Sequence, residues 1–231
     1  MNFNDSKYFF DGARRMLPVL TGVIPFGLVM GTVSADAELS LGQSVSMNFL
    51  AYAGAAQLAA IDLMTKQTPI LVIILTGLVI NLRFLLYSAA MAPALRNSSF
   101  GVKLTSAYFL TDQAYAVVSA HEDELPGPKE RVQFYLGTSV CMAIFWHLSV
   151  VAGYSFGNFA PKSWSLEYAV PLSFVALLVP TLKNRSYIYV AAFSSVISVL
   201  LHELPYRLGL VVTAILALTL AAWISRKRVA R

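Results

Sequence analysis

The 231-residue sequence has few charged residues and a single cysteine. Charged side chains make up 13% of it, against about 25% in an ordinary soluble domain. Hydrophobic residues make up 57%, and the mean hydropathy is +0.65. A soluble globular protein needs more polar surface than this composition supplies, and a disordered chain needs far fewer apolar residues. The lone Cys141 excludes an intramolecular disulfide framework and a cysteine-rich metal site.

Motifs of catalysis and cofactor binding are also missing. The sequence contains no Walker motif, no HExxH and no dinucleotide-binding fingerprint. Gly153–Gly157 matches G-x-S-x-G, but it closes an apolar helical segment, whereas a nucleophile elbow needs a strand–turn–helix with histidine and acid partners. We therefore expect no enzyme activity, no cofactor and no metal. An intramembrane hydrolase that uses Ser155 is the least favoured alternative.

The net charge of +5 is concentrated at the ends of apolar runs. Lys7, Arg14 and Arg15 precede the first run, and the basic tail Arg226–Arg231 follows the last. Basic flanks of this kind mark the cytoplasmic side of a membrane protein and meet anionic headgroups. A nucleic-acid-binding protein would instead carry a basic face on a folded domain. We expect contact with the lipid bilayer, no nucleic acid, and both termini in the cytoplasm.

Eight apolar segments follow one another along the chain, and about 20 helical residues suffice to cross a bilayer. They are Met16–Val33, Leu41–Met64, Pro69–Leu95, Lys103–Ala120, Val132–Phe156, Leu166–Leu182, Tyr187–Leu201 and Pro205–Ile224. The pattern predicts an all-α polytopic membrane protein with six to eight hydrophobic segments, forming a single transmembrane domain over residues 1–231.

Two arrangements of these segments are open. In one, all eight cross the membrane. In the other, Leu41–Met64 and Leu166–Leu182 are re-entrant hairpins and six segments cross. Both arrangements place twelve Lys and Arg residues inside and four outside, so the positive-inside rule does not separate them. The second arrangement makes residues 16–120 and 132–224 a possible inverted repeat, as in many secondary transporters.

Two segments carry residues that interrupt or polarise a helix. In the first, Gly22, Pro25 and Gly27 predict an interruption, because proline removes a backbone hydrogen bond and glycine removes a side chain. This interruption is either an unwound substrate site or a packing kink beside the small-residue pair Gly27 and Gly31. In the second, the amide of Gln57 either binds a ligand or bridges to another helix.

Arg83 lies near the middle of the third segment, after Asn81. A charge there costs at least about 2.5 kcal/mol even on insertion scales, so an intramembrane arginine indicates a functional site. Helical spacing puts Thr76, Arg83 and Tyr87 on one face. The guanidinium group can clamp a carboxylate ligand, or it can form a structural ion pair with Asp112.

Asp112 is the corresponding acid in the fourth segment. Tyr108, Asp112, Tyr115 and Ser119 follow the spacing of one helical face, which predicts a polar stripe on an otherwise apolar helix. Asp112 can carry a proton, pair with Arg83, or do both in turn. His147 in the fifth segment is either a proton relay or a histidine hydrogen-bonded to a neighbouring helix.

These strings together resemble the AzlC family, the large subunits of bacterial two-component branched-chain amino acid exporters. The matching strings are Gly22–Gly27, Ala53–Gln57, Asn81–Arg83 with Leu86–Tyr87 and Ala92–Pro93, Leu110–Asp112, Leu166–Pro171, Leu177–Pro180, Leu204–Pro205 and Leu208–Leu210. The chain departs from the family pattern at Phe84, where a histidine is usual, at Gln113, where an acid is usual, and at Glu167–Tyr168, which is more often Asp-Phe.

The resemblance implies a secondary transporter that exports branched-chain and sometimes methionine-like L-amino acids across the bacterial inner membrane. It also implies a small AzlD-type membrane subunit as partner, with a homo-oligomer of that heterodimer as a further possibility. An amino acid zwitterion requires a cation and an acceptor, which Arg83 and Asp112 provide. A non-transporting membrane scaffold is the alternative. It would have the same composition but would not require these two charges.

Overall fold

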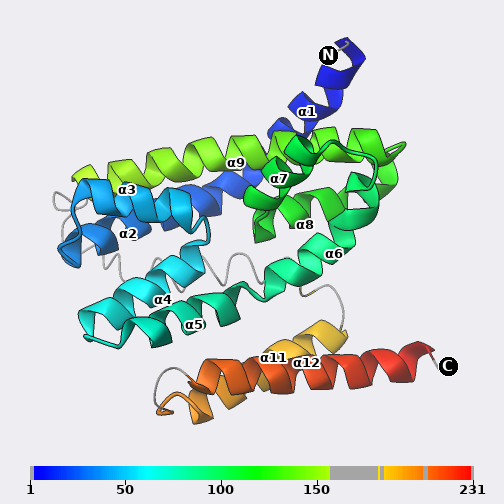
Figure 1. Ribbon diagram of the computed structural model, residues 1–231. Coiled ribbons are helices and arrows are strands. Elements are labelled where there is room, and N and C mark those ends of the chain that lie inside the picture. Colours follow the sequence, from blue (N-terminus) through cyan, green and yellow to red (C-terminus); the bar gives the residue numbers. More distant parts are fainter. Residues whose placement is uncertain (1–2, 157–181, 183–184, 205–207, 230–231) are drawn as a thin grey trace. The chain divides into compact units, whose positions relative to one another are not determined.

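The computed structural model describes residues 3–156, 182, 185–204 and 208–229, and these are helical apart from short turns (Figure 1). The predicted all-α class is confirmed. The chain divides into two compact units, Met1–Ser173 and Phe174–Arg231, and each is described by itself.

The centre of the first unit is the long helix α9 (Pro128–Phe156). Alongside it lie α1 (Phe3–Met16) and α2 (Leu20–Asp36), joined by a 3-10 turn, Leu17–Val19. Lys7–Asp36 and Pro128–Phe156 are the two described helices that are long and apolar enough to cross a membrane. The two ends of this unit are called the Pro128 end and the Phe156 end below.

Glycines allow α1 and α2 to approach α9 at backbone distance. A Cβ added at Gly137 would lie 1.9 Å from the carbonyl oxygen of Phe9, and one at Gly153 would lie 2.0 Å from that of Leu28. Gly31 meets the backbone of Val150 in the same way. The small residues of the first segment therefore serve helix packing.

The predicted interruption of the first segment is not present, because α2 continues as a helix through Pro25. Pro25 is exposed on the outer side of α2, while Phe26 and Gly27 are buried. Pro25 removes one backbone hydrogen bond, and the close packing of Gly27 and Gly31 against α9 holds the part of the helix that follows it.

The second predicted segment is a hairpin of two short helices, α3 (Leu41–Leu50) and α4 (Gly54–Thr65). A capping box between Ser40 and Gln43 starts α3. The hydroxyl group of Tyr154 donates to the carbonyl of Leu39 at 2.6 Å, so the hairpin begins at the Phe156 end. The side chain of Gln57 donates to the carbonyl of Met47 at 3.1 Å, which ties the first turn of α4 to the end of α3.

The third segment consists of α5 (Ile70–Asn81) and α6 (Arg83–Leu95), bent by 40° between them. Taken as one span, the pair is the third candidate for crossing a membrane in the described residues. It leads from the α4–α5 turn back to α9, and α6 packs against α9 and against α7 (Phe100–Tyr108) (Figure 1).

The fourth segment was predicted as one span over Lys103–Ala120, and this prediction is wrong. It forms two helices of nine residues, α7 (Phe100–Tyr108) and α8 (Asp112–Ala120). Ser106 contacts Tyr135 of α9, Thr111 contacts Met142, and the ring of His121 lies 5.7 Å from that of Phe134. The chain therefore moves along α9 to its middle and returns to the Pro128 end. The side chain of Thr111 caps α8 by accepting from the amide of Ala114, and this cap starts a new helix there.

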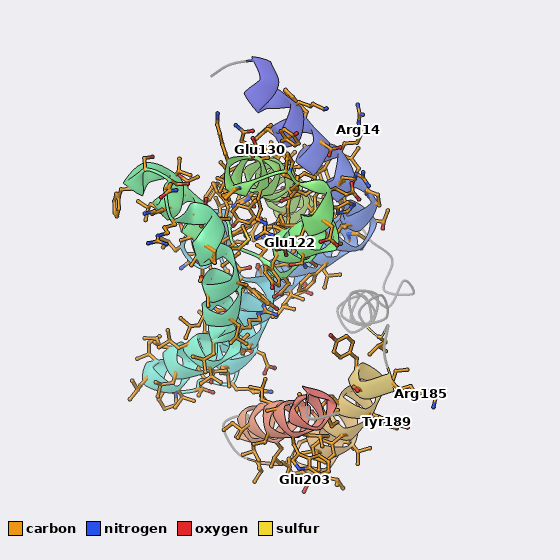
Figure 2. All side chains as sticks on the ribbon, turned by 90° about the vertical axis from the view of Figure 1, so that its right-hand side faces the viewer. Arg14, Glu122, Glu130, Arg185, Tyr189 and Glu203 are labelled. Atoms are coloured by element: carbon orange, nitrogen blue, oxygen red, sulfur yellow. The ribbon has the colours of Figure 1, made fainter. Side chains whose placement is uncertain are left out.

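At the Pro128 end, ion pairs join the connection between α8 and α9 to α1 and to the start of α9. Arg15 contacts Glu124 at 3.0 Å and the ring of His121 at 3.0 Å, and Arg131 pairs with Glu122. Figure 2 views this end, with Arg14, Glu122 and Glu130 gathered around the start of α9. The beginning of the chain and the 121–131 connection therefore lie at the same end of the unit.

The second unit contains α11 (Arg185–Leu200) and α12 (Leu208–Val229), which pack against each other. The predicted segment Leu166–Leu182 lies outside the described residues except for Leu182. The described helices thus supply two or three candidate spans, fewer than the six to eight segments predicted. The inverted repeat and the position of the termini stay predictions.

Candidate functional site

Three helix breaks meet at the middle of α9. The turn between α3 and α4 is held there because the indole nitrogen of Trp146 donates to Asn48 at 2.6 Å. The turn between α7 and α8 is held by the contact of Thr111 with Met142, at 3.1 Å. The bend between α5 and α6 reaches the turn between α7 and α8 through Arg83, which pairs with Asp112. We call residues 51–53, 81–83 and 109–112 the junction.

Arg83 and Asp112 form an ion pair across the junction. Nη1 of Arg83 lies 2.7 Å from Oδ2 of Asp112, and the two side chains are 30% and 29% exposed. The guanidinium group lies over the ring of Phe84, 5.2 Å from its centroid. Tyr87 contacts the same carboxylate and stacks on Tyr115 at 4.5 Å. The ion pair with Asp112, one of the two alternatives that the sequence left open for Arg83, is therefore present.

The pair leaves hydrogen-bonding capacity unused. Nε of Arg83, Oδ1 of Asp112 and Oδ1 of Asn81 are each covered and have no hydrogen-bond partner in the described structure. Covered polar atoms are normally paired, so three unpaired ones at a single ion pair need an explanation. Together they present one donor and two acceptors, a set that can bind a ligand carrying both charges.

Gln57 and Asn48 hold the α3–α4 hairpin together. The amide nitrogen of Gln57 donates to the carbonyl of Met47 and lies 3.4 Å from Oδ1 of Asn48, which also accepts from Trp146. Gln57 is 1% exposed, yet its Oε1 has no hydrogen-bond partner among the described residues. The amide nitrogen of Gln57 thus bridges α4 to α3, while its oxygen can still accept a hydrogen bond. At the start of α4 the residue before the helix, Ala53, supplies no side-chain cap.

His147 lies in an aromatic cluster beside this hairpin. Its ring stacks on Tyr52 at 5.4 Å and contacts Phe49 at 4.3 Å, and its Nδ1 bonds to the carbonyl of Ala143 at 2.7 Å. Nε2 of His147 and the hydroxyl group of Tyr52 are covered and have no partner in the described structure. The hydrogen bond to its own helix is a structural role, and a proton-relay role for Nε2 stays a prediction.

Two predicted polar faces are altered by the breaks. Tyr108 ends α7 and donates to the carbonyl of Phe49 at 2.7 Å, so it does not share a face with Asp112, which starts α8. Likewise the bend at Leu82 separates Thr76 on α5 from Arg83 on α6. Both predicted faces required one uninterrupted helix, and the breaks at Leu82 and before Asp112 remove that condition.

The first segment contributes little to the junction. Gly27 packs on Ser149, Pro25 is exposed, and a Cβ added at Gly22 would meet nothing within 4 Å. Phe26 is the residue of this segment that reaches the junction, because it and Trp146 both crowd the position of a Cβ at Gly54. A substrate role for Gly22, Pro25 and Gly27 stays a prediction without a contact that supports it.

Sequence reasoning missed Asn48, Trp146 and Thr111. Thr111 precedes Asp112 at the start of an apolar run, which is a recognisable helix start. Asn48 offered the weaker signal of a carboxamide within an apolar segment. Nothing in the sequence distinguished Trp146 from other tryptophans.

Known proteins match most of this chain. Residues 18–160 match the AzlC protein family. A membrane protein of Helicobacter pylori strain 26695, named as uncharacterized, is 23% identical over 229 residues, covering 96% of both chains. A membrane protein of Archaeoglobus fulgidus with the same designation is 25% identical over 228 residues, covering 96% of this chain and 98% of the relative. No solved structure matches.

The match to the family covers more than half of the chain and includes every residue of the junction. Relatives named as membrane proteins match almost its full length. With its apolar helices, this makes the protein a helical membrane protein, and the chain belongs to the AzlC family.

Proposed function

We propose that the protein is the large subunit of a secondary transporter that exports branched-chain, and also methionine-like, L-amino acids across the bacterial inner membrane. The observation that supports this best is the junction: three helix breaks and an ion pair at the middle of a helix that is long enough to span a bilayer. Discontinuous helices near the membrane midplane are where secondary transporters bind their substrates.

The ion pair accounts for recognition of an amino acid. The substrate carboxylate binds the guanidinium group of Arg83, and the substrate ammonium group binds Asp112, so the ligand replaces each partner of the pair by an equal charge. Asn81 and Gln57 add acceptors, and the uncapped start of α4 adds backbone donors near the positive end of a helix dipole. No isolated charge is left in the bilayer at any stage.

The distribution of basic residues supports an orientation. Among the described residues of the first unit, the Pro128 end carries Lys7, Arg14, Arg15, Arg96, Lys103, Lys129 and Arg131, and the Phe156 end carries Lys66. By the positive-inside rule the Pro128 end is cytoplasmic, with the N-terminus on that side. The α3–α4 hairpin then enters from outside and the α7–α8 hairpin from inside, so the two hairpins approach the junction from opposite faces.

The choice of branched-chain substrates and the small AzlD-type partner subunit rests on family membership. Transport is tested by counterflow of leucine, isoleucine, valine and methionine in proteoliposomes, with and without the small subunit. We expect exchange of these four amino acids and none of aspartate or lysine. Absence of exchange in the presence of the small subunit contradicts the proposal and favours a scaffold. No observation favours a hydrolase, because Ser155 lies in the last helical turn of α9.

A further inference from the structure

A cavity lies between α6, α7 and α9 toward the Pro128 end, and it borders the junction at Leu110. Its volume is about 770 Å³ and it opens to the surface. The walls are mainly apolar or small: Ala89, Met91, Ala92, Pro93, Leu95, Ala107 and Leu110. A cavity of this size lies in the upper range for small-molecule sites, and its lining suits hydrocarbon.

The mouth of this cavity is basic. Arg96 and Lys103, both exposed, lie on its rim. Neither forms an ion pair within the described part of the chain, and none of the described residues lining the cavity is acidic. Deeper in the wall, Ser106 is 2% exposed, and its hydroxyl group has no hydrogen-bond partner in the part of the chain that the structure describes. The site therefore offers two cations and a buried hydroxyl group at one end of an apolar space.

We infer that this cavity binds an anionic phospholipid, with the phosphate at Arg96 and Lys103 and part of an acyl chain between α6 and α7. An amino acid fits less well, because its ammonium group would meet two cations and no carboxylate. Basic pockets between membrane helices on the cytoplasmic side are suited to anionic headgroups. The Pro128 end, where the basic residues of the first unit collect, is the end at which such lipids are expected.

The apolar wall of the cavity favours a phospholipid over a free anion. Phosphate alone would use the two cations and leave the apolar surface of α6 and α7 in contact with water. A phospholipid covers both, so its affinity should exceed that of phosphate and depend on both headgroup charge and chain. This dependence on two features distinguishes the site from a general attraction between a basic surface and anions.

The test is native mass spectrometry of the full chain in detergent, titrated with phosphatidylglycerol or with phosphatidylcholine of the same chains. We expect Arg96→Gln/Lys103→Gln to weaken phosphatidylglycerol binding by about 30-fold, from the usual contribution of two basic residues at a membrane surface. The control Lys7→Gln/Arg14→Gln removes two charges at the same end and should bind as wild type does. Ala92→Phe fills the cavity, keeps both cations and should also weaken binding.

Three results would overturn the inference. They are equal affinity for the two lipids, unchanged phosphatidylglycerol binding in the Arg96→Gln/Lys103→Gln variant, and displacement of the lipid by millimolar inorganic phosphate. The last result would identify an anion site without a lipid component. Binding does not depend on transport, so the outcome is independent of whether the protein exports amino acids.

Discussion

The ion pair between Arg83 and Asp112 can be tested by neutralising its members one at a time and then together. Removing one partner of a fully buried pair costs about 3–5 kcal/mol, whereas a fully exposed pair contributes at most about 1 kcal/mol. The two side chains are 30% and 29% exposed, between these limits. We therefore expect Arg83→Gln or Asp112→Asn to lower the free energy of unfolding by about 2 kcal/mol, about a 30-fold change in the unfolding equilibrium.

The double variant Arg83→Gln/Asp112→Asn leaves no unpaired charge. Its free energy of unfolding should return to within about 1 kcal/mol of the wild-type value, since replacing both partners of a pair is often nearly neutral. If the pair binds substrate charges, the double variant should still fail to transport. Recovery of stability without recovery of transport is the signature of a binding role, because a structural ion pair would restore both.

Both quantities are measured on the same purified proteins. Unfolding is followed by tryptophan fluorescence during titration with denaturing detergent, and transport by leucine counterflow. Counterflow by the double variant at a wild-type rate would refute the reasoning, since neither the carboxylate nor the ammonium group of a substrate would then need these charges. Single variants as stable as the wild type would show that the 2.7 Å contact contributes nothing to folding.

Three further predictions concern coupling, packing and topology. Asp112→Asn, which cannot change its charge, should flatten the dependence of the residual transport rate on pH; a profile that keeps its wild-type shape contradicts a proton-carrying role. Gly153→Ala should prevent accumulation of folded protein in the membrane, because its Cβ would lie 2.0 Å from the carbonyl oxygen of Leu28. The control Gly22→Ala, whose Cβ would meet nothing within 4 Å, should accumulate normally. Equal yields of the two variants would contradict the packing argument. In a cysteine-free background, a cysteine at Lys66 should react with impermeant reagents from outside and one at Asp123 only from inside; labelling of both from one side contradicts the hairpin arrangement.

The sequence predicted the chemistry of the junction better than its geometry. Arg83 and Asp112 were identifiable because an ionised side chain within an apolar run is costly and needs a partner. The local breaks were harder to place. Hydropathy averaged over the length of a span hides the short polar run Thr111–Gln113, so it does not show that a cap at Thr111 begins a second helix. Pro25 has the opposite effect: it suggests a break, yet packing of α2 on α9 keeps the helix whole.

The partners of buried polar groups were also beyond sequence reasoning. Asn48 receives a hydrogen bond from Trp146, which lies 98 positions away, and the contact depends on how the α3–α4 hairpin is placed on α9. Residue type alone does not specify such a pair. The role of Gln57 was open between ligand and bridge for the same reason, and the structure assigns its nitrogen to the bridge.

The glycine contacts along α9 determine which parts of the first unit can move. Where backbone touches backbone, as at Gly31, Gly137 and Gly153, two helices cannot slide without collision. Helices α1, α2 and α9 therefore form a fixed frame. The hairpins α3–α4 and α7–α8 are held to that frame at the junction by side-chain contacts, such as those of Asn48, His147 and Thr111. We expect exposure of the junction to one side or the other to come from rocking of these hairpins against an immobile frame.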